Sequence, residues 1–279
     1  MLIDGRLIAQ SVFDNLTKKV GELKEEGITP HLAVILIGDD PSSKAYVRQK
    51  ELKLTQIGGA ITTHRFSNSF TQEELVRLIK ELNDDSIVHG IIVQRPLPPQ
   101  IDKDVITDAT SPEKDVDGFL DNSPFEPPIA MAVMRILREI FKQTNQQGDL
   151  HDWLKTKKIA IIGKGYTAGA PIIKLFTNHE IPLTIIDSST TNRQEILASS
   201  DIVISAVGKT ETLKADELKD GVIVIGVGMH RGEDDKLHGD YDEESIGTKA
   251  AFYTPVPGGI GPVNVAMLLV NLIKAAETV

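Results

Sequence analysis

The segment IAIIGKGYTAGAP, from Ile159 to Pro171, predicts a short buried strand, a glycine turn and the start of a helix. Its glycines are Gly163, Gly165 and Gly169. A glycine at a strand exit permits a tight turn, and a second glycine lets the backbone approach a pyrophosphate. The helix that follows offers unpaired N–H donors at its N-terminus. The spacing is GxGxxxG rather than GxGxxG, so a purely structural turn stays open as an alternative to a dinucleotide site.

Asp187 ends the next predicted strand, PLTIID. In NAD sites an acidic residue about 20 residues beyond the glycines accepts hydrogen bonds from the adenosine ribose. An ordinary turn aspartate is the alternative. Together the glycine turn and Asp187 favour nucleotide binding, and NAD over NADP because a carboxylate repels a ribose 2′-phosphate. The nearby cations Lys164 and Arg193 would reverse that preference if they faced the phosphate.

Strands and helices alternate along most of the chain on both sides of this segment. Short apolar runs rich in β-branched residues predict strands, and apolar residues three and four apart predict amphipathic helices. The predicted strands are His31–Gly38, Ala60–Phe66, Gly90–Gln94 and the segments KKIAIIG, PLTIID, DIVISAVG and GVIVIGVG. The predicted helices are Leu7–Glu26, Ser42–Ile57, Thr71–Asn83, Ile129–Phe141, Ala170–Asn178, Asn192–Ser199 and Val263–Ala276. This alternation favours parallel sheets.

Two stretches interrupt the alternation. The proline-rich stretch from Pro96 to Pro128 has no period and predicts loop and linker, and the charged stretch from His230 to Glu244 predicts a solvated loop. A length of 279 residues suits two domains of about 150 residues each. We therefore expect an α/β fold with two lobes. The first is an N-terminal substrate domain, 1–125, completed by the C-terminal helix 263–279; the second, 126–262, holds a linker helix and a Rossmann-like dinucleotide-binding domain.

Composition excludes several classes of protein. Lys and Arg number 30 against 40 Asp and Glu, and the resulting net charge of −10 is unsuited to nucleic acid or anionic membrane partners. There is no cysteine, which excludes disulfides and thiolate metal sites, and the seven histidines show no ligand spacing, so no metal site is predicted. No apolar run is long enough for a membrane span and the first residues do not resemble a secretory signal, so a cytoplasmic location is expected.

Several polar side chains in the first lobe are candidates for chemistry. Tyr46 and Lys50 are four residues apart on one face of a predicted helix, where a phenol and an amine can hold an aromatic substrate and move a proton. Gln94 ends a strand and can orient the amine without neutralising it. Asp115 and Asp117 alternate, so only one of them is expected to enter a cleft. An exposed surface pair for Tyr46 and Lys50, and a loop-bonded glutamine, are the alternatives.

Four motifs now make a resemblance visible: DDPSSKAYVRQK, GIIVQRPLP, PEKDVDGF and YTPVPGGIGP. In this order, with a glycine-turn strand between the last two, they resemble the bifunctional methylenetetrahydrofolate dehydrogenase/methenyltetrahydrofolate cyclohydrolase (FolD-type) family. The resemblance covers nearly the whole chain. It implies an enzyme of one-carbon metabolism that transfers a hydride from 5,10-methylenetetrahydrofolate to NAD or NADP and hydrolyses the methenyl product to 10-formyltetrahydrofolate. It also implies a homodimer.

The resemblance assigns roles to individual residues. It implies that Lys50 is the catalytic lysine, that Tyr46 packs on the folate, that Gln94 positions Lys50 and that Asp117 binds the pterin. The residues implied to shape the wall between folate and nicotinamide are Pro255, Gly258, Gly259, Gly261 and Pro262. The residues implied to bind the cofactor are Gly163, Lys164, Gly165, Gly169, Asp187 and Ser188.

The chain departs from the family pattern in its supporting residues. The loop after DVDGF is short, and PFEPPIAMA stands where the family has PCTP. GKGYTAGAP replaces GRSxxVGxP, Arg95 replaces a leucine and Asn264 replaces a threonine. These changes keep two alternatives open: an NAD-dependent dehydrogenase without the hydrolytic half, or a catalytically degenerate relative that only binds folate or nucleotide.

Overall fold

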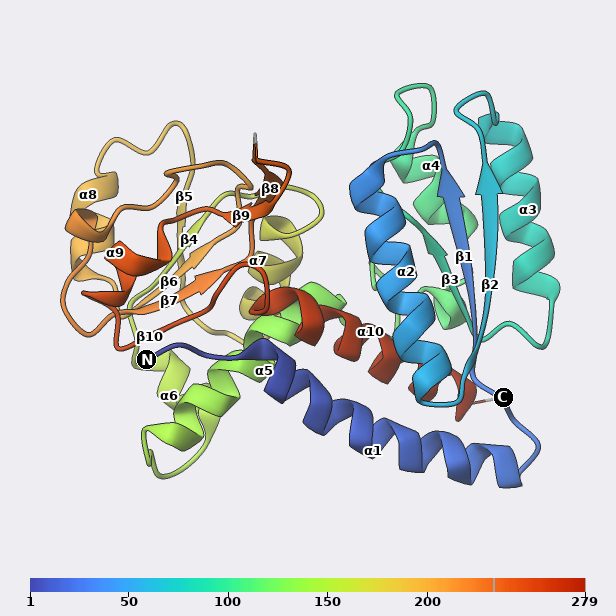
Figure 1. Ribbon diagram of the computed structural model, residues 1–279, viewed down its shortest axis with the longest axis horizontal. Coiled ribbons are helices and arrows are strands. Elements are labelled where there is room, and N and C mark those ends of the chain that lie inside the picture. Colours follow the sequence, from blue (N-terminus) through green and yellow to red (C-terminus); the bar gives the residue numbers. More distant parts are fainter. Residues whose placement is uncertain (233, 279) are drawn as a thin grey trace. The chain divides into compact units, whose positions relative to one another are not determined.

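The computed structural model describes residues 1–232 and 234–278 and divides into two compact units, each built around a parallel sheet (Figure 1). The three-stranded unit consists of Gln10–Pro128 and Val265–Val279, and the five-stranded unit consists of Met1–Ala9 and Ile129–Asn264. Val279, the last residue of the predicted range 263–279, lies outside the described residues. The predicted two-lobed α/β architecture is confirmed.

The sheet of the three-stranded unit has the order β2-β1-β3, with all strands parallel. Its strands are β1 (His31–Ile37), β2 (Ala60–Phe66) and β3 (Gly90–Val93), and its connecting helices are α2 (Pro41–Gln56) and α3 (Gln72–Asp84). The helices α1 (Gly5–Glu25) and α10 (Ile260–Ala276) each begin in the five-stranded unit and contribute most of their length here. α2 and α3 lie on opposite faces of the sheet (Figure 1). Six of the seven residues of the central strand β1 are buried, because helices cover both faces.

Both connecting helices begin at capping side chains that the sequence provides. The carboxylate of Asp40 accepts the N–H of Ser43 at 2.7 Å, and Pro41 occupies the first turn of α2. At α3 the Thr71 hydroxyl accepts the N–H of Glu74, whose carboxylate accepts the N–H of Thr71 in return. These caps determine the residue at which each helix begins after the preceding strand.

The sheet of the five-stranded unit has the order β10-β7-β6-β4-β5, again parallel throughout. Its strands are β4 (Ile159–Ile162), β5 (Thr184–Ile186), β6 (Ile202–Ser205), β7 (Ile223–Gly226) and β10 (Phe252–Tyr253). Its helices include α5 (Pro128–Gln143), α7 (Gly169–Asn178) and α8 (Arg193–Ser199). After β4 the chain moves outward to β5, whereas β6, on the other side of β4, is followed by β7 and β10. The carboxyl ends of β4 and β6 therefore form the topological switch point where such sheets bind ligands.

The first residues of the chain extend this sheet beside β10. Leu2 forms a parallel bridge with Tyr253, Ile3 N–H donates to the Tyr253 carbonyl at 2.8 Å, and Tyr253 N–H donates to the Met1 carbonyl at 3.0 Å. A Cβ on Gly5 would collide with the carbonyl of Gly259, so only glycine lets the chain pass here. The predicted substrate domain begins at Met1, whereas this segment packs with the five-stranded unit.

The two stretches predicted as loops contain regular structure, and this corrects the sequence-based expectation. Between Pro96 and Pro128 the chain forms α4 (Lys103–Ala109) and a 3₁₀ turn, η1 (Pro112–Lys114). Asp102 caps α4 by accepting N–H groups of its first turn. The stretch His230–Glu244 contains most of an antiparallel hairpin, formed by β8 (Met229–Arg231) and β9 (Leu237–Gly239). It also contains the first residues of α9 (Glu243–Gly247). Glu233, within this stretch, lies outside the described residues. These elements are too short to show a hydrophobic period.

Some further short elements, the strand β10 among them, were not expected. The helix α6 (Leu150–Lys155) follows the polar stretch after α5, and the 3₁₀ turn η2 (Ala215–Glu217) precedes β7.

Over residues 1–232 and 234–278, no helix combines the length and the apolar character needed to cross a membrane.

The core between the sheet and α3 gives a test of the packing. Ile79 of α3 is fully buried against β1, whereas Ile87 is 61 % exposed. Ile79→Ala leaves a cavity and should lower the free energy of unfolding by about 2–5 kcal/mol. Ile87→Ala should change it by no more than about 0.5 kcal/mol. Urea unfolding followed by circular dichroism measures both, and equal effects of the two variants would contradict the described packing.

Candidate functional site

Lys50 is the centre of a buried polar group in the three-stranded unit. It lies on α2, one turn after Tyr46, and its side chain points toward the carboxyl end of β3. Lys50 is only 7 % exposed, and its Nζ donates to Oε1 of Gln94 at 3.0 Å. The structure therefore brings together Lys50 and Gln94, which are 44 residues apart in the sequence.

The amide of Gln94 is held in one orientation. Its Nε2 donates to the carbonyl of Arg95 at 2.8 Å, and the buried Ser43 hydroxyl donates to the same carbonyl at 3.3 Å. With the amide nitrogen engaged, the amide oxygen faces Lys50. Ser43 was not among the predicted site residues, because it acts on a backbone carbonyl and no side-chain pattern reveals that contact.

Burial changes the acid–base behaviour of two residues on α2. Removal from water lowers the pKa of Lys50, since the charged ammonium loses solvation, while the Asp117 carboxylate acts in the opposite direction. Burial also raises the pKa of the Tyr46 phenol. Lys50 therefore releases its proton more readily than an exposed lysine, and Tyr46 stays neutral at neutral pH.

Asp115 and Asp117 occupy different environments. Asp115 is buried, and its Oδ2 accepts the N–H of Leu120 at 2.8 Å, whereas Asp117 is half-buried. Burial, reinforced by the neighbouring Asp117 charge, raises the pKa of Asp115 to about 6. Asp115 thus fixes the turn, and Asp117 is the carboxylate that interacts electrostatically with Lys50.

The segment that carries Asp117 is anchored from two directions. Lys114 Nζ donates to the carbonyls of Leu82, Asn83 and Asp85 at the end of α3, at 2.6–2.9 Å. Asn271 of α10 donates its Nδ2 to the carbonyls of Val116 and Glu126, both at 2.9 Å.

The backbone and one neighbouring side chain complete this segment. Gly118 has φ +66°, and a Cβ there would be 2.7 Å from the Phe125 carbonyl oxygen, so glycine is required. Arg95, which differs from the family pattern, donates to Thr107 Oγ1 at 2.9 Å and lies over the Phe119 ring at 4.8 Å. A small cavity lies beside these groups, with Asp115 and Asp117 in its wall.

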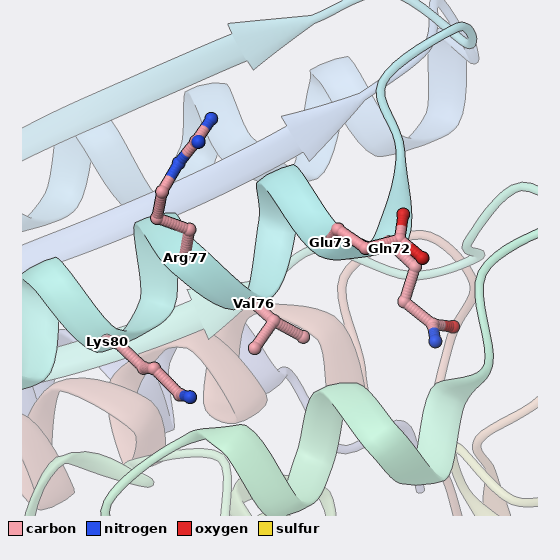
Figure 2. Close-up of a pocket in the computed structure, with 5 residues that line it drawn as sticks. All are labelled: Gln72, Glu73, Val76, Arg77 and Lys80. Carbon is pink, nitrogen blue, oxygen red and sulfur yellow. The ribbon is translucent and has the colours of Figure 1, made fainter.

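A second pocket of the same unit is lined only by one helix. Figure 2 shows its lining residues, Gln72, Glu73, Val76, Arg77 and Lys80, all on α3. Arg77 and Lys80 point in different directions and do not converge on a common point (Figure 2). None of the predicted site residues lines this pocket.

The three glycines after β4 in the five-stranded unit fit a dinucleotide, each for a different reason. Gly163 has φ +93°, which a tight turn requires. A Cβ on Gly169 would collide with the carbonyl of Gly163, so glycine lets α7 pack closely on the turn. Gly165 has no atom within 4 Å of the position of a Cβ and leaves the backbone open to a ligand. These match the three glycine roles in dinucleotide-binding turns, and no side chain caps the start of α7 at Ala168.

Asp187 lies beside this turn and is paired with Lys164. Lys164 Nζ is 2.7 Å from Asp187 Oδ2, while Asp187 Oδ1 accepts the N–H and the hydroxyl of Ser189. The Lys164 ammonium, helped by Ser189, holds the pKa of Asp187 well below its usual range. Ser188 is exposed in the same turn. Arg193 forms an ion pair with Glu217, with its Nε 2.9 Å from Glu217 Oε1.

The segment from Pro255 to Gly259 forms a turn that leads into α10, whose first turn contains Gly261 and Pro262. Gly259 N–H donates to the Pro255 carbonyl at 2.8 Å, and Gly258 has φ +115°. Arg6 lies against Gly258, with its guanidinium carbon 3.2 Å from the position of a Cβ. Nothing lies within 4 Å of a Cβ on Gly261.

Within the described part of the chain, no group of three or more His, Asp or Glu could hold a metal ion.

Comparison with known proteins gives matches over the whole chain. The model of the tetrahydrofolate dehydrogenase/cyclohydrolase catalytic domain matches residues 3–117, and that of the NAD(P)-binding domain of the same family matches residues 127–279. The bifunctional protein FolD of Nautilia profundicola is 40 % identical, covering 99 % of this chain and 97 % of the relative. The bifunctional protein FolD of Bacillus subtilis is 38 % identical with the same coverage.

Solved structures show the same similarity. The bifunctional FolD enzyme of Campylobacter jejuni has a TM-score of 0.91 at 35 % identity, covering 100 % of this chain and 99 % of that one. The FolD enzyme of Trypanosoma brucei, solved with NADP and an inhibitor, has a TM-score of 0.89 at 32 % identity, covering 100 % and 97 %.

Asp115 predicts a pH dependence of stability. Because the pKa of Asp115 rises from 3.8 to about 6 on folding, protonated Asp115 stabilises the folded state. This contribution to the free energy of unfolding is fully present below about pH 4 and is lost as the pH rises through about 6. Asp115→Asn has no such proton. Between pH 4 and 7 the free energy of unfolding of the wild type should therefore fall by up to about 3 kcal/mol relative to that of the variant.

Urea unfolding at several pH values measures this difference, with the exposed Asp108→Asn as the control that should follow the wild type. Parallel pH profiles of the wild type and Asp115→Asn would contradict the assigned environment of Asp115.

Proposed function

The chain belongs to the tetrahydrofolate dehydrogenase/cyclohydrolase family, and from this membership we propose that the Lys50 group is where the folate substrate reacts. The protein is a bifunctional enzyme of one-carbon metabolism. It oxidises 5,10-methylenetetrahydrofolate with NAD(P) and hydrolyses the resulting methenyl compound to 10-formyltetrahydrofolate. The assignment of the reacting group rests on one observation: the buried Lys50 donates a hydrogen bond from its Nζ to Gln94 Oε1.

We propose distinct roles for the four residues of this group. Lys50, whose pKa is lowered by burial, exchanges protons with the attacking water and the ring nitrogen as the methenyl bridge opens. Gln94 holds the Lys50 amine without neutralising it. Tyr46 packs on the aromatic ring system, which suits a phenol that burial keeps neutral. Asp117 binds the pterin through its carboxylate.

We propose that the five-stranded unit holds the nucleotide and the three-stranded unit holds the folate. Bound NAD(P) supplies the hydride acceptor. The turn containing Gly163, Gly165 and Gly169 approaches the pyrophosphate, because Gly165 leaves the backbone open and α7 starts without a side-chain cap. The residues proposed to form the wall beside the nicotinamide are Pro255, Gly258, Gly259, Gly261 and Pro262.

We also propose that NAD is preferred to NADP. Asp187 and Ser188 follow β5 at the place where an adenosine ribose binds, and the Asp187 carboxylate repels a 2′-phosphate. The charge of Lys164 is engaged by Asp187, and that of Arg193 by Glu217, so both cations lie in ion pairs. From the family resemblance we further propose a cytoplasmic homodimer.

The direct test is to follow the oxidation of 5,10-methylenetetrahydrofolate with NAD and NADP in parallel, and then the decay of added methenyltetrahydrofolate. Turnover in both assays supports the two proposed sites. Oxidation without accelerated decay would indicate a dehydrogenase alone, and tight binding without turnover would indicate a degenerate relative.

Replacement of Lys50 tests its role. Lys50→Met removes the amine while keeping an unbranched chain, so cyclohydrolase activity should fall by about 100-fold or more. The matched control is Lys44→Met on the same helix, where an exposed lysine pairs with Asp39. Initial rates of methenyl hydrolysis measure both variants. The assigned role is wrong if Lys50→Met hydrolyses the substrate at the wild-type rate.

Replacement of Asp187 tests the nucleotide preference. Asp187→Asn removes one negative charge beside the ribose site and frees Lys164, so kcat/KM with NADP relative to NAD should rise by about tenfold. Asp152→Asn, at an exposed position on α6, is the charge-matched control. Steady-state kinetics with both nucleotides measure the ratio, and an unchanged ratio for Asp187→Asn would contradict the proposed preference.

A further inference from the structure

Asp240 is a fully buried aspartate whose carboxylate is surrounded by hydrogen-bond donors. Its Oδ2 accepts the Ser205 hydroxyl at 2.7 Å and the Val207 N–H at 2.9 Å. Its Oδ1 accepts the N–H groups of Gly208 at 2.7 Å and Lys209 at 3.0 Å. All four donors are neutral, and three are successive backbone groups of the turn that follows β6.

This arrangement determines the shape of the turn. A buried carboxylate is stable only when donors replace its lost hydration, and successive N–H groups facing one anion form such a site. Gly208 has φ +77°, and a Cβ on Gly228 would collide with the Asp240 carboxylate. The turn is therefore folded around Asp240, and glycines at both places allow the close approach.

The turn held by Asp240 packs against the glycine turn after β4. Ala206 N–H donates to the Ile162 carbonyl at 2.8 Å. A Cβ on Gly163 would be 2.8 Å from the Ala206 carbonyl oxygen and 3.0 Å from Val207 Cγ2. The two turns thus touch at the switch point between β4 and β6. The Val207 side chain, apolar yet 39 % exposed, lies against Gly163.

We propose that Asp240 is a positioning residue for nucleotide binding, because its buried carboxylate holds the turn after β6 against the Gly163 turn. The inference rests on the proposed nucleotide site. Replacement of Asp240 should therefore affect the two activities differently. Hydride transfer requires the nucleotide and should depend on Asp240, whereas methenyl hydrolysis requires no nucleotide and should be independent of Asp240.

Asp240→Asn keeps the shape of the side chain but replaces one accepting oxygen by an NH₂ group that faces N–H donors. We expect the KM and the dissociation constant for the preferred nucleotide to rise about tenfold or more, with the hydrolysis rate within about twofold of wild type. Ser205→Ala removes one of the four donors and should shift both constants in the same direction by less. Asp242→Asn, two residues away at the start of α9, removes an exposed aspartate and should shift neither.

The experiment combines calorimetric titration with NAD and with NADP, steady-state kinetics of both reactions and thermal unfolding. Unchanged nucleotide constants in Asp240→Asn and Ser205→Ala would overturn the inference. So would equal losses of both activities at unchanged KM, which indicate a role in stability only. If Asp240→Asn does not fold, Ser205→Ala decides by the same criteria. A wild-type protein that binds neither nucleotide would refute the proposed nucleotide site itself, and this inference with it.

Discussion

Parallel pairing is the constraint from which the arrangement of both principal sheets follows. Two parallel neighbours cannot be joined by a tight hairpin, so the chain must cross a face of the sheet before the next strand begins. Within each sheet every strand then ends at the same edge. Gln94 follows β3 in the three-stranded unit, whereas Gly163, Asp187 and Ala206 follow β4, β5 and β6 in the five-stranded unit. Within each unit, residues far apart in the sequence therefore meet at this edge because of chain direction.

The same constraint explains how much the sequence could reveal. Strands buried on both faces, such as β1, β4 and β6, have continuous apolar runs and were predicted from them. The more exposed β2 and β5 were predicted from their place in the alternation of strands and helices. The strand β10, two residues long, was not predicted. The capped helix α4 was missed because its seven residues lie within a proline-rich stretch, and the β8–β9 hairpin because polar, charged side chains hide it. Lys50 and Gln94 were predicted as candidates from helix spacing and strand-end position. Ser43 and Asp240 act on backbone groups, which no side-chain pattern reports.

Three buried ionisable groups differ in the hydrogen-bond donors and partners that replace their lost hydration. Asp240 is surrounded by four neutral donors, so its hydration is replaced within the unit. Lys50 has Gln94 as a neutral hydrogen-bond partner, and Asp115 accepts a backbone N–H from Leu120; burial shifts the pKa of both toward the neutral form. Asp240 and Asp115 hold the backbone turns that surround them. Lys50 releases its proton more readily than an exposed lysine, which suits the acid–base role proposed for it.

The hydrogen bonds from Asn271 to the carbonyls of Val116 and Glu126 span 155 and 145 residues of sequence. They tie the segment that carries Asp117 to α10, which follows every strand of both sheets along the chain. During synthesis the three strands of the first sheet emerge early, but this anchor is absent until α10 has left the ribosome. A nascent chain that stops before α10 can therefore form the sheet and the contacts of Lys114, yet it lacks the hydrogen bonds of Asn271. The segment that carries Asp117 gains this second anchor only after the five-stranded unit has been translated.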